Sequence, residues 1–217
     1  MKKNFLESAR HIAVEGPIGV GKTSLARRLA EYLDAGLLLE QPEENPFLAR
    51  FYRDPRHYAL QTQLCFLFQR LGQMRALAQP ELFTRAVICD YLMEKELLFA
   101  SLTLDDDEYS LYRQIYDRVA GQSVPAPDLV IYLQAGTEFL IERVRKRGAE
   151  MERRIDDDYL ARLGECYIRF FHDYTAAPVM VVNSEHLDFA ADPDDFQLLV
   201  QRIEAMRGPR AYFNRGN

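Results

Sequence analysis

The hydrophobic positions of this chain fall into two alternating patterns. Five short runs are apolar at nearly every position and rich in Val, Ile and Leu, which is typical of strands covered on both faces of a parallel sheet. These runs are residues 10–15, 36–40, 86–90, 128–134 and 178–183. Between them, apolar residues recur with helical spacing, as in Leu25, Leu29 and Leu33, and again over residues 60–74. The alternation predicts an α/β fold with a five-stranded parallel sheet flanked by helices.

Neither composition nor turn-forming residues divide the chain. Its 217 residues, 48% hydrophobic and 28% charged, are within the range of an ordinary globular domain. No internal repeat, low-complexity tract or linker-like run interrupts them. We therefore expect one domain over residues 1–217.

The charge balance and the apolar runs restrict the partners and the location. The net charge of −6 opposes binding to a nucleic acid polymer. No stretch of about 20 apolar residues is present to span a membrane, and the N-terminal sequence lacks the apolar core of a signal peptide. The sequence thus predicts a cytoplasmic protein with neither a membrane nor a nucleic acid as partner.

The strongest motif follows the first apolar run and precedes the leucine stripe. The segment GPIGVGKT fits the pattern G-x-x-x-x-G-K-[ST] in its required strand, loop and helix context. In such a loop, backbone amides and the helix N-terminus surround a polyphosphate, the lysine bridges the outer phosphates and the threonine binds Mg²⁺. The sequence therefore predicts a P-loop kinase fold that uses ATP with Mg²⁺, and Lys22 is also expected to be catalytic. The expected ATP-binding residues are Gly16, Pro17, Ile18, Gly19, Val20, Gly21, Lys22 and Thr23.

Two carboxylates end predicted strands. Asp90 closes the third run, where it could hold Mg²⁺ together with Thr23, although Asp is also a common turn former. Glu40 closes the second run, where it could take the proton of an acceptor hydroxyl or be a solvated strand end. Ligands of open α/β sheets bind at the carboxyl ends of the strands, and this position favours function for both residues.

A basic cluster follows the fourth run. Arg143 and Arg147 are four residues apart on a predicted helix, so they share one face and could both contact the transferring phosphate. The neighbouring Arg145 and Lys146 are more typical of a solvated face. We expect the arginine pair to be catalytic.

Several segments, taken in order, resemble the deoxynucleoside kinase family and its bacterial branch in particular. They cover nearly the whole chain and are GPIGVGKTS, EQPEENPFLARFYRDP, RHYALQTQLCFLFQR, AVICD, IYLQA and RVRKRGAEMERRI. The resemblance implies transfer of a phosphoryl group to the 5′-hydroxyl of a deoxynucleoside. It also implies small-molecule nucleoside and nucleotide partners, a homodimer, and an arginine-rich lid at about residues 147–156.

The resemblance assigns roles to individual residues. It implies Glu40 as the base at the acceptor 5′-hydroxyl and Tyr52 with Glu152 as contacts to the sugar 3′-hydroxyl. Gln63 would bind the edge of the acceptor base, and Arg70 would lie near that base and Glu40. In the same comparison, the Arg143 and Arg147 pair matches the lid arginines that cover the ATP phosphates.

Two departures from the family pattern concern the acceptor site. Where the family usually carries D-R-S, this chain has Asp90, Tyr91 and Leu92, so the arginine that contacts the acceptor hydroxyl is missing. Without that cation, we expect a raised pKa for Glu40, with Arg70 as the nearest replacement. The following segment offers no clear counterpart of the family's base-reading aspartate.

Two other functions stay open at this point. A nucleoside monophosphate kinase would need extra cations for the acceptor phosphate, and the sequence shows none near Glu40. A P-loop regulatory module with little turnover would lack an acceptor pocket. The sequence leaves open the preferred base of the acceptor and the preferred triphosphate donor.

Overall fold

Parallel strands form one sheet at the centre of the computed structural model, which describes residues 5–77, 86–119, 126–148, 155–189 and 191–215. Within these residues the sheet has six strands in the order β2-β3-β1-β4-β5-β6, and every neighbouring pair is parallel. The strands are β1 (His11–Glu15), β2 (Gly36–Leu38), β3 (Val87–Cys89), β4 (Leu129–Gln134), β5 (Val179–Asn183) and β6 (Arg210–Phe213).

The prediction of five strands is therefore wrong by one. The five apolar runs each contain a strand, but β6 lies beyond them, paired with β5 in the register Val179 to Arg210. Strand β6 is four residues long and lies at the sheet edge, and its Tyr212 is 62% exposed. A short edge strand needs no continuous apolar run, so hydrophobic patterning did not mark it.

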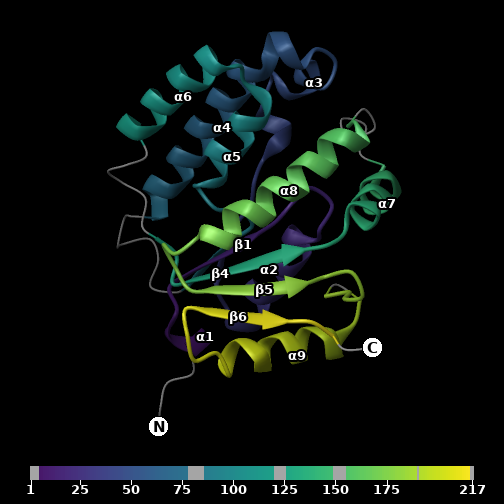
Figure 1. Ribbon diagram of the computed structural model, residues 1–217. Coiled ribbons are helices and arrows are strands. Elements are labelled where there is room, and N and C mark those ends of the chain that lie inside the picture. Colours follow the sequence, from purple (N-terminus) through teal and green to yellow (C-terminus); the bar gives the residue numbers. More distant parts are fainter. Residues whose placement is uncertain (1–4, 78–85, 120–125, 149–154, 190, 216–217) are drawn as a thin grey trace.

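Helices cover both faces of the sheet (Figure 1). None of the helices in the described ranges has the length and apolar character needed to cross a membrane. The helices are α1 (Phe5–Ser8), α2 (Lys22–Leu33), α3 (Leu48–Phe51), α4 (Pro55–Leu77), α5 (Lys95–Thr103), α6 (Asp106–Val119), α7 (Thr137–Arg147), α8 (Asp157–Asp173) and α9 (Pro193–Glu204), with a short 3-10 turn η1 (Pro42–Glu44).

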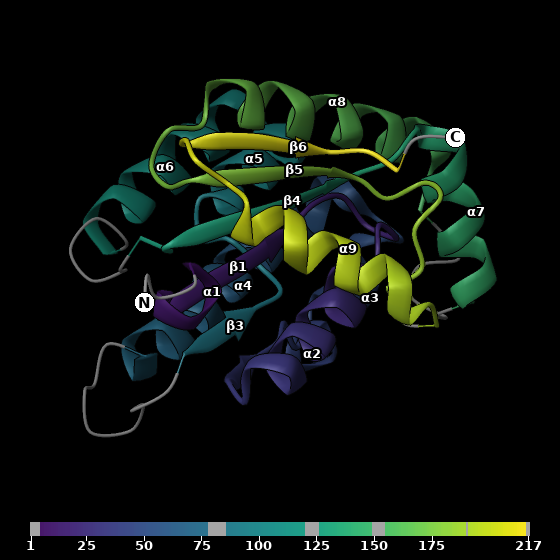
Figure 2. The ribbon, with the colours of Figure 1, turned by 90° about the horizontal axis from the view of Figure 1, so that it is seen from below.

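Alternate residues of β4 pack into two different cores. Leu129, Ile131 and Leu133 join the cluster formed with α1, α2 and α9, whereas Val130 and Tyr132 join the cluster formed with α5 and α8. Figure 2, seen from below, shows α1, α2 and α9 on the first of these faces. Side chains of a strand point alternately to the two faces, so a continuous apolar run is what a strand covered on both sides requires.

A second layer of helices carries part of the site. Helices α4, α5 and α6 share a core that includes Leu67, Leu71, Ala100 and Tyr112. Fully burying each large apolar side chain contributes roughly 1.5–3 kcal/mol, so this cluster holds α4 and α5 firmly against each other. Polar residues on α4 and α5 are thereby positioned near the carboxyl ends of β1, β2 and β3.

Candidate active site

The loop after β1 depends on glycine at two positions. Gly16 has φ +152°, and a Cβ there would lie 2.3 Å from the backbone oxygen of Leu133 on β4. Gly21 has φ +103° and is the N-cap of α2. A side chain at the first position would collide with the sheet, and at the second it would be strained by the left-handed backbone. The backbone of the predicted P-loop therefore requires glycine at these two positions.

Lys22 is the first residue of α2 and folds back over the loop. Its Nζ donates to the carbonyl oxygens of Gly16 at 2.7 Å and Pro17 at 3.1 Å. Burial lowers the pKa of Lys22, and the nearby ammonium of Lys95 lowers it further, while the surrounding carboxylates oppose the shift. The side chain thus lies at the centre of the loop that was predicted to bind phosphate.

Thr23 and Asp90 meet, as a shared metal site would require. The Thr23 hydroxyl donates to Asp90 Oδ2 at 2.6 Å, and Asp90 Oδ1 accepts the backbone N–H of Glu40 at 2.8 Å. One buried carboxylate therefore joins the start of α2, the end of β3 and the segment after β2. Hydroxyl and carboxylate oxygens fit Mg²⁺, which is held by few protein ligands together with phosphate and water oxygens. Accordingly, the described residues contain no cluster of three or more His, Cys, Asp or Glu side chains suited to a metal.

A buried carboxylate that the sequence interpretation overlooked lies under the loop. Glu15 Oε1 accepts the N–H of Gly16 at 2.7 Å and the hydroxyl of Tyr167 at 2.9 Å, and its Oε2 accepts the N–H of Leu92 at 2.7 Å. It joins the P-loop, the segment after β3 and helix α8. Its place at the carboxyl end of an apolar strand is the sequence signal that could have found it.

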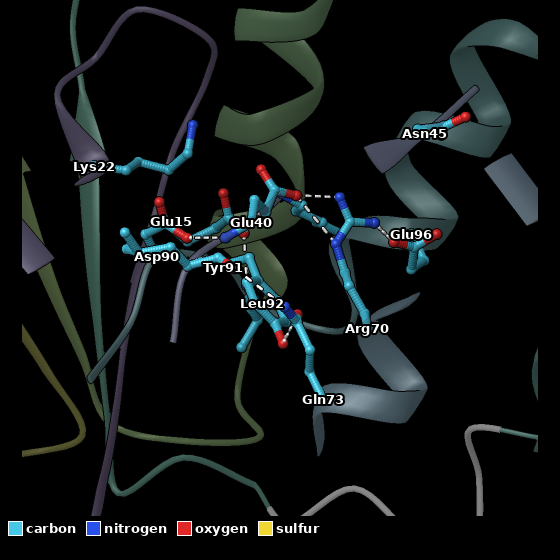
Figure 3. A network of polar contacts seen from close by, with 12 residues as sticks. Glu15, Lys22, Glu40, Asn45, Arg70, Gln73, Asp90, Tyr91, Leu92 and Glu96 are labelled. Atoms are coloured by element: carbon cyan, nitrogen blue, oxygen red, sulfur yellow. Dashed lines mark hydrogen bonds and ion pairs between the residues drawn. The ribbon is translucent and has the colours of Figure 1, made fainter. Parts of the chain in front are cut away.

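Glu40 lies between the P-loop side of the site and α4, and Figure 3 shows its carboxylate facing Arg70. The side chain is 23% exposed. Its Oε1 accepts from Arg70 Nε at 3.0 Å, pairs with Arg70 Nη2, and lies 2.6 Å from Lys95 Nζ. Burial raises the pKa of Glu40, but the cations of Arg70, Lys95 and Lys22 outweigh burial and hold it well below its usual value.

This corrects two expectations. The missing D-R-S arginine does not leave Glu40 with a raised pKa, because two buried cations contact its carboxylate. Beyond Arg70, no cation was expected near Glu40, yet Lys95 lies there as well. Arg70 was predicted at this place, whereas Lys95 was not.

Arg70 also has an acidic partner that the sequence analysis did not identify. Its Nη1 pairs with Glu96 Oε1 on α5, and Glu96 Oε2 accepts the hydroxyl of Tyr112 at 2.5 Å. Figure 3 shows the guanidinium between Glu40 and Glu96. Three adjacent charged residues, Glu94, Lys95 and Glu96, in the otherwise apolar stretch after β3 were the available signal.

The remaining acceptor residues lie further along α3 and α4. Gln63 is buried, and its Nε2 donates to the Thr103 hydroxyl at 3.2 Å. Tyr52 is half-buried at the end of α3, packed against the cluster around Phe51. Glu152 and most of the predicted lid lie outside the described residues. The structure therefore brings Glu40 and Arg70 together and places Gln63 two helical turns before Arg70.

The two arginines of α7 have different environments. Arg143 is half-buried, and its guanidinium donates to the carbonyl oxygens of Val20 at 3.3 Å and Ser184 at 2.8 Å. Arg147 is exposed at the end of the helix. Arg143 thus ties the P-loop to the segment after β5, and its predicted contact with phosphate would require a different arrangement of its side chain.

A cavity of about 560 Å³ opens beside the P-loop. Its wall includes Gly21 and Ser24 from the loop and α2, Arg143 from α7, and Asp188 and Arg215 from the segments after β5 and β6. A volume of this size suits a small organic ligand. The cavity adjoins the P-loop, so a ligand held at the loop could extend into it.

The chain is similar over most of its length to proteins of one family. A family model described as deoxynucleoside kinase matches residues 12–206. The deoxyguanosine kinase of Bacillus subtilis (strain 168) is 31% identical over 93% of this chain and 99% of its own length. The deoxyadenosine kinase of Dictyostelium discoideum is 31% identical over 95% of this chain and 84% of its own length. The structure of deoxyadenosine kinase from M. mycoides with bound dATP is 25% identical, with a TM-score of 0.78 over 89% of this chain and 98% of that one.

Proposed function

The chain belongs to the deoxynucleoside kinase family and is a nucleoside kinase that makes the monophosphate, and on this premise we propose a specific reaction. The enzyme transfers the γ-phosphoryl group of ATP, or of another nucleoside triphosphate, to the 5′-hydroxyl of a deoxynucleoside. The observation that supports this proposal is the position of the Glu40 carboxylate. Two cations hold it at the carboxyl ends of the strands, on the same side of the sheet as Lys22 and Asp90.

In this reaction Glu40 is the general base. The acceptor oxygen bonds to the γ-phosphorus as its proton passes to Glu40, and the bond from that phosphorus to the bridging oxygen breaks, leaving the nucleoside diphosphate. Lys22, whose ammonium group lies over the P-loop, is proposed to neutralise the charge of the transferring group. The lowered pKa of Glu40 keeps its carboxylate ionised at neutral pH.

Thr23 and Asp90 are the proposed magnesium residues. Bound Mg²⁺ would neutralise the phosphate oxygens and orient the donor. The fit rests on the oxygen donors of the two side chains, which lie 2.6 Å apart. Replacing Thr23 with Ala should raise the Mg²⁺ concentration that gives half-maximal activity, and a Mg²⁺ titration at fixed ATP measures it. An unchanged Mg²⁺ requirement would contradict this assignment.

The donor nucleotide is proposed to occupy the P-loop and the adjoining cavity. Residues 16–23 surround its phosphates, and the 560 Å³ cavity takes its base and sugar. Arg143 and Arg147 are proposed to contact the phosphates of the bound donor. For Arg143 this means exchanging the carbonyl contacts described above for phosphate oxygens, which bind a guanidinium more strongly.

The acceptor is proposed to lie beside Glu40, next to α3 and α4. Gln63 and Arg70 would contact its base, and Tyr52 with Glu152 its 3′-hydroxyl. The relatives named deoxyguanosine kinase and deoxyadenosine kinase make purine deoxynucleosides the first acceptors to assay. Equal kcat/KM for a deoxynucleoside and its 3′-deoxy analogue would remove Tyr52 and Glu152 from the site, because a site built for a hydroxyl discriminates strongly against its absence.

The charges around Glu40 favour a neutral acceptor over a nucleoside monophosphate. The cations of this network are Lys22, Arg70 and Lys95, and its carboxylates are Glu15, Glu40, Asp90 and Glu96. Three cations against four carboxylates leave no positive charge in excess among these described side chains. These side chains therefore supply no surplus positive charge for a phosphate carried by the acceptor.

The test of the general base is Glu40→Gln. The amide keeps the shape of the side chain and can still bond the acceptor hydroxyl, but it cannot take the proton, so kcat should fall by about 10²- to 10⁴-fold. The acceptor Kd should change much less. Glu165→Gln, at an exposed position of α8, is the matched control and should keep its kcat. A Glu40→Gln enzyme with near-normal kcat would show that the hydroxyl loses its proton in another way.

We also propose that the enzyme is a cytoplasmic homodimer. Helix α4 carries Phe68, which is 58% exposed, and the adjoining α6 carries Leu111, which is 49% exposed. Large apolar side chains on two packed helices offer a surface for a second copy of the chain. Sedimentation equilibrium of the wild type and of Phe68→Asp tests this, because a dimer through α4 should dissociate on the substitution. Cell fractionation tests the location.

A further inference from the structure

Lys95 is a buried cation at the centre of the site to which no role has yet been assigned. It is the first residue of α5, and its side chain is 3% exposed. Its Nζ lies 2.6 Å from Glu40 Oε1 and 4.0 Å from Glu15 Oε2. A buried ammonium is costly unless a carboxylate pairs with it, so the contact with Glu40 is what allows the charge to be there.

Two aromatic rings flank the ammonium group. Lys95 Nζ lies 6.0 Å from the ring centre of Tyr91 and 5.8 Å from that of Phe99. Tyr91 stands at the sequence position of the missing D-R-S arginine, and its hydroxyl donates to Gln73 at 2.8 Å. The ammonium of Lys95 therefore contacts Glu40 from a position four residues after Tyr91, and it lies over the ring of Tyr91, which occupies the arginine position.

The other cation on Glu40 is differently placed. Arg70 divides its guanidinium between Glu40 and the buried Glu96, which also binds Tyr112. Among the described residues, one carboxylate lies within hydrogen-bond distance of Lys95 Nζ, and it belongs to Glu40. Arg70 is anchored without Glu40, whereas the ammonium of Lys95 is directed to it.

The contacts of both cations fall on the same oxygen of Glu40. Arg70 Nε, Arg70 Nη2 and Lys95 Nζ all meet Oε1, and no hydrogen bond to Oε2 is found among the described residues. The carboxylate is thus held at one oxygen. The second oxygen is left to accept the proton of the acceptor.

We propose that Lys95 is the positioning residue of the general base and takes the place of the strand-end arginine that this chain lacks. It acts through Glu40, by holding Oε1 and thereby directing Oε2 towards the acceptor hydroxyl. This inference rests on the proposed role of Glu40 as the base. It assigns to α5 a function that sequence comparison had left to Arg70 alone.

The experiment is a double-mutant cycle of Lys95→Met and Glu40→Gln, with kcat, KM for the deoxynucleoside and acceptor Kd measured for each enzyme. In the wild-type background, Lys95→Met should lower kcat by about 10²-fold, on the scale of removing one preorganised group, and change Kd by less than roughly threefold. In the Glu40→Gln background, the same substitution should lower kcat by less than roughly threefold, because no carboxylate remains to be directed.

Controls separate positioning from folding. Arg169→Met removes an exposed cation of α8 and should leave all constants unchanged. Lys95→Arg keeps the charge and should recover at least about a tenth of the wild-type kcat, which loss of packing alone would not predict. If Lys95→Met does not fold, Lys95→Gln replaces it in the cycle, since it keeps a polar end and removes the charge.

Three results would overturn the inference. A folded Lys95→Met enzyme with near-normal kcat would show that Lys95 is not needed. Equal losses of kcat in both backgrounds would show a structural effect independent of Glu40, and so would a Lys95→Arg enzyme as slow as Lys95→Met. Failure of the proposed function looks different, because Glu40→Gln alone would then keep its kcat.

Discussion

Replacing Glu15 with Gln should destabilise the fold although it changes one atom of a buried side chain that is not itself proposed to contact a ligand. The carboxylate accepts three hydrogen bonds, from the N–H groups of Gly16 and Leu92 and from the hydroxyl of Tyr167. An amide has one acceptor oxygen, so its NH₂ group must face one of these donors. In the less damaging orientation the oxygen keeps Gly16 and Tyr167, and the amide faces Leu92.

The expected loss follows from these contacts. One buried N–H left without an acceptor costs about 1–3 kcal/mol. The negative charge 4.0 Å from Lys95 is also removed, and a pair at that distance is worth at most about 4 kcal/mol near a protein surface. Because Lys95 keeps Glu40 as a closer partner, we expect removal of the Glu15 charge to cost only a small part of that energy. The free energy of unfolding should fall by about 3 kcal/mol, or roughly 6–12 °C in Tm for a chain of this length.

Urea denaturation and thermal unfolding of matched variants test the reasoning. Tyr167→Phe removes one donor and no charge, so it should cost about 1.5 kcal/mol, half of the effect of Glu15→Gln. Glu165→Gln is the exposed control and should stay within about 0.5 kcal/mol of the wild type. A loss below about 0.5 kcal/mol for Glu15→Gln would refute the view that this carboxylate joins the P-loop to its neighbours.

Three further predictions follow from individual contacts. Burial raises the pKa of Glu40, but neighbouring cations outweigh burial and hold it below its usual 4.5. Its ion pairs therefore stabilise the fold fully above the unfolded pKa, and this stability is lost progressively as the pH falls from 4.5 towards the lowered value. Urea titrations should show the wild type losing more stability than Glu40→Gln between about pH 5 and pH 2. Gly16→Ala should cost about 3 kcal/mol because its Cβ would collide with β4, whereas Gly21→Ala, with open space but positive φ, should cost about 1–2 kcal/mol; thermal unfolding compares them. Arg215→Ala should cost about 2 kcal/mol in urea denaturation, because it leaves the buried Asp195 without its ion pair, and no loss would contradict the pairing.

Much of the sheet could be predicted because its strands are buried on both faces. A strand of that kind must be apolar at successive positions, so the run at residues 128–134 located β4 to within one residue. Strand β6 obeys a different rule. It is an edge strand paired with β5 on one side, and its Tyr212 is largely exposed. Its apolar content therefore carries little information.

The site likewise contains some residues that could be predicted as neighbours and others that could not. Lys22, Thr23, Glu40 and Asp90 could be predicted as neighbours because a parallel topology brings the carboxyl ends of successive strands to one edge. Their roles stay predictions. The partners on α5 could not be found, because their contacts depend on how a helix packs across the sheet edge. No short motif encodes the approach of Lys95 to Glu40 or of Glu96 to Arg70.

The missing arginine shows why comparison by sequence position can mislead at a charged site. What Glu40 requires is a positive charge within contact distance, and the backbone position that supplies it is secondary. Lys95, four residues after Tyr91 on the first turn of α5, meets that requirement. Its ammonium lies over the ring of Tyr91 and contacts Glu40. The exchange has a consequence for evolution of the site. Introducing an arginine at position 91 alone would bring a third cation to a carboxylate that already has two, and would remove the ring beneath Lys95, so it should lower activity unless Lys95 is neutralised at the same time.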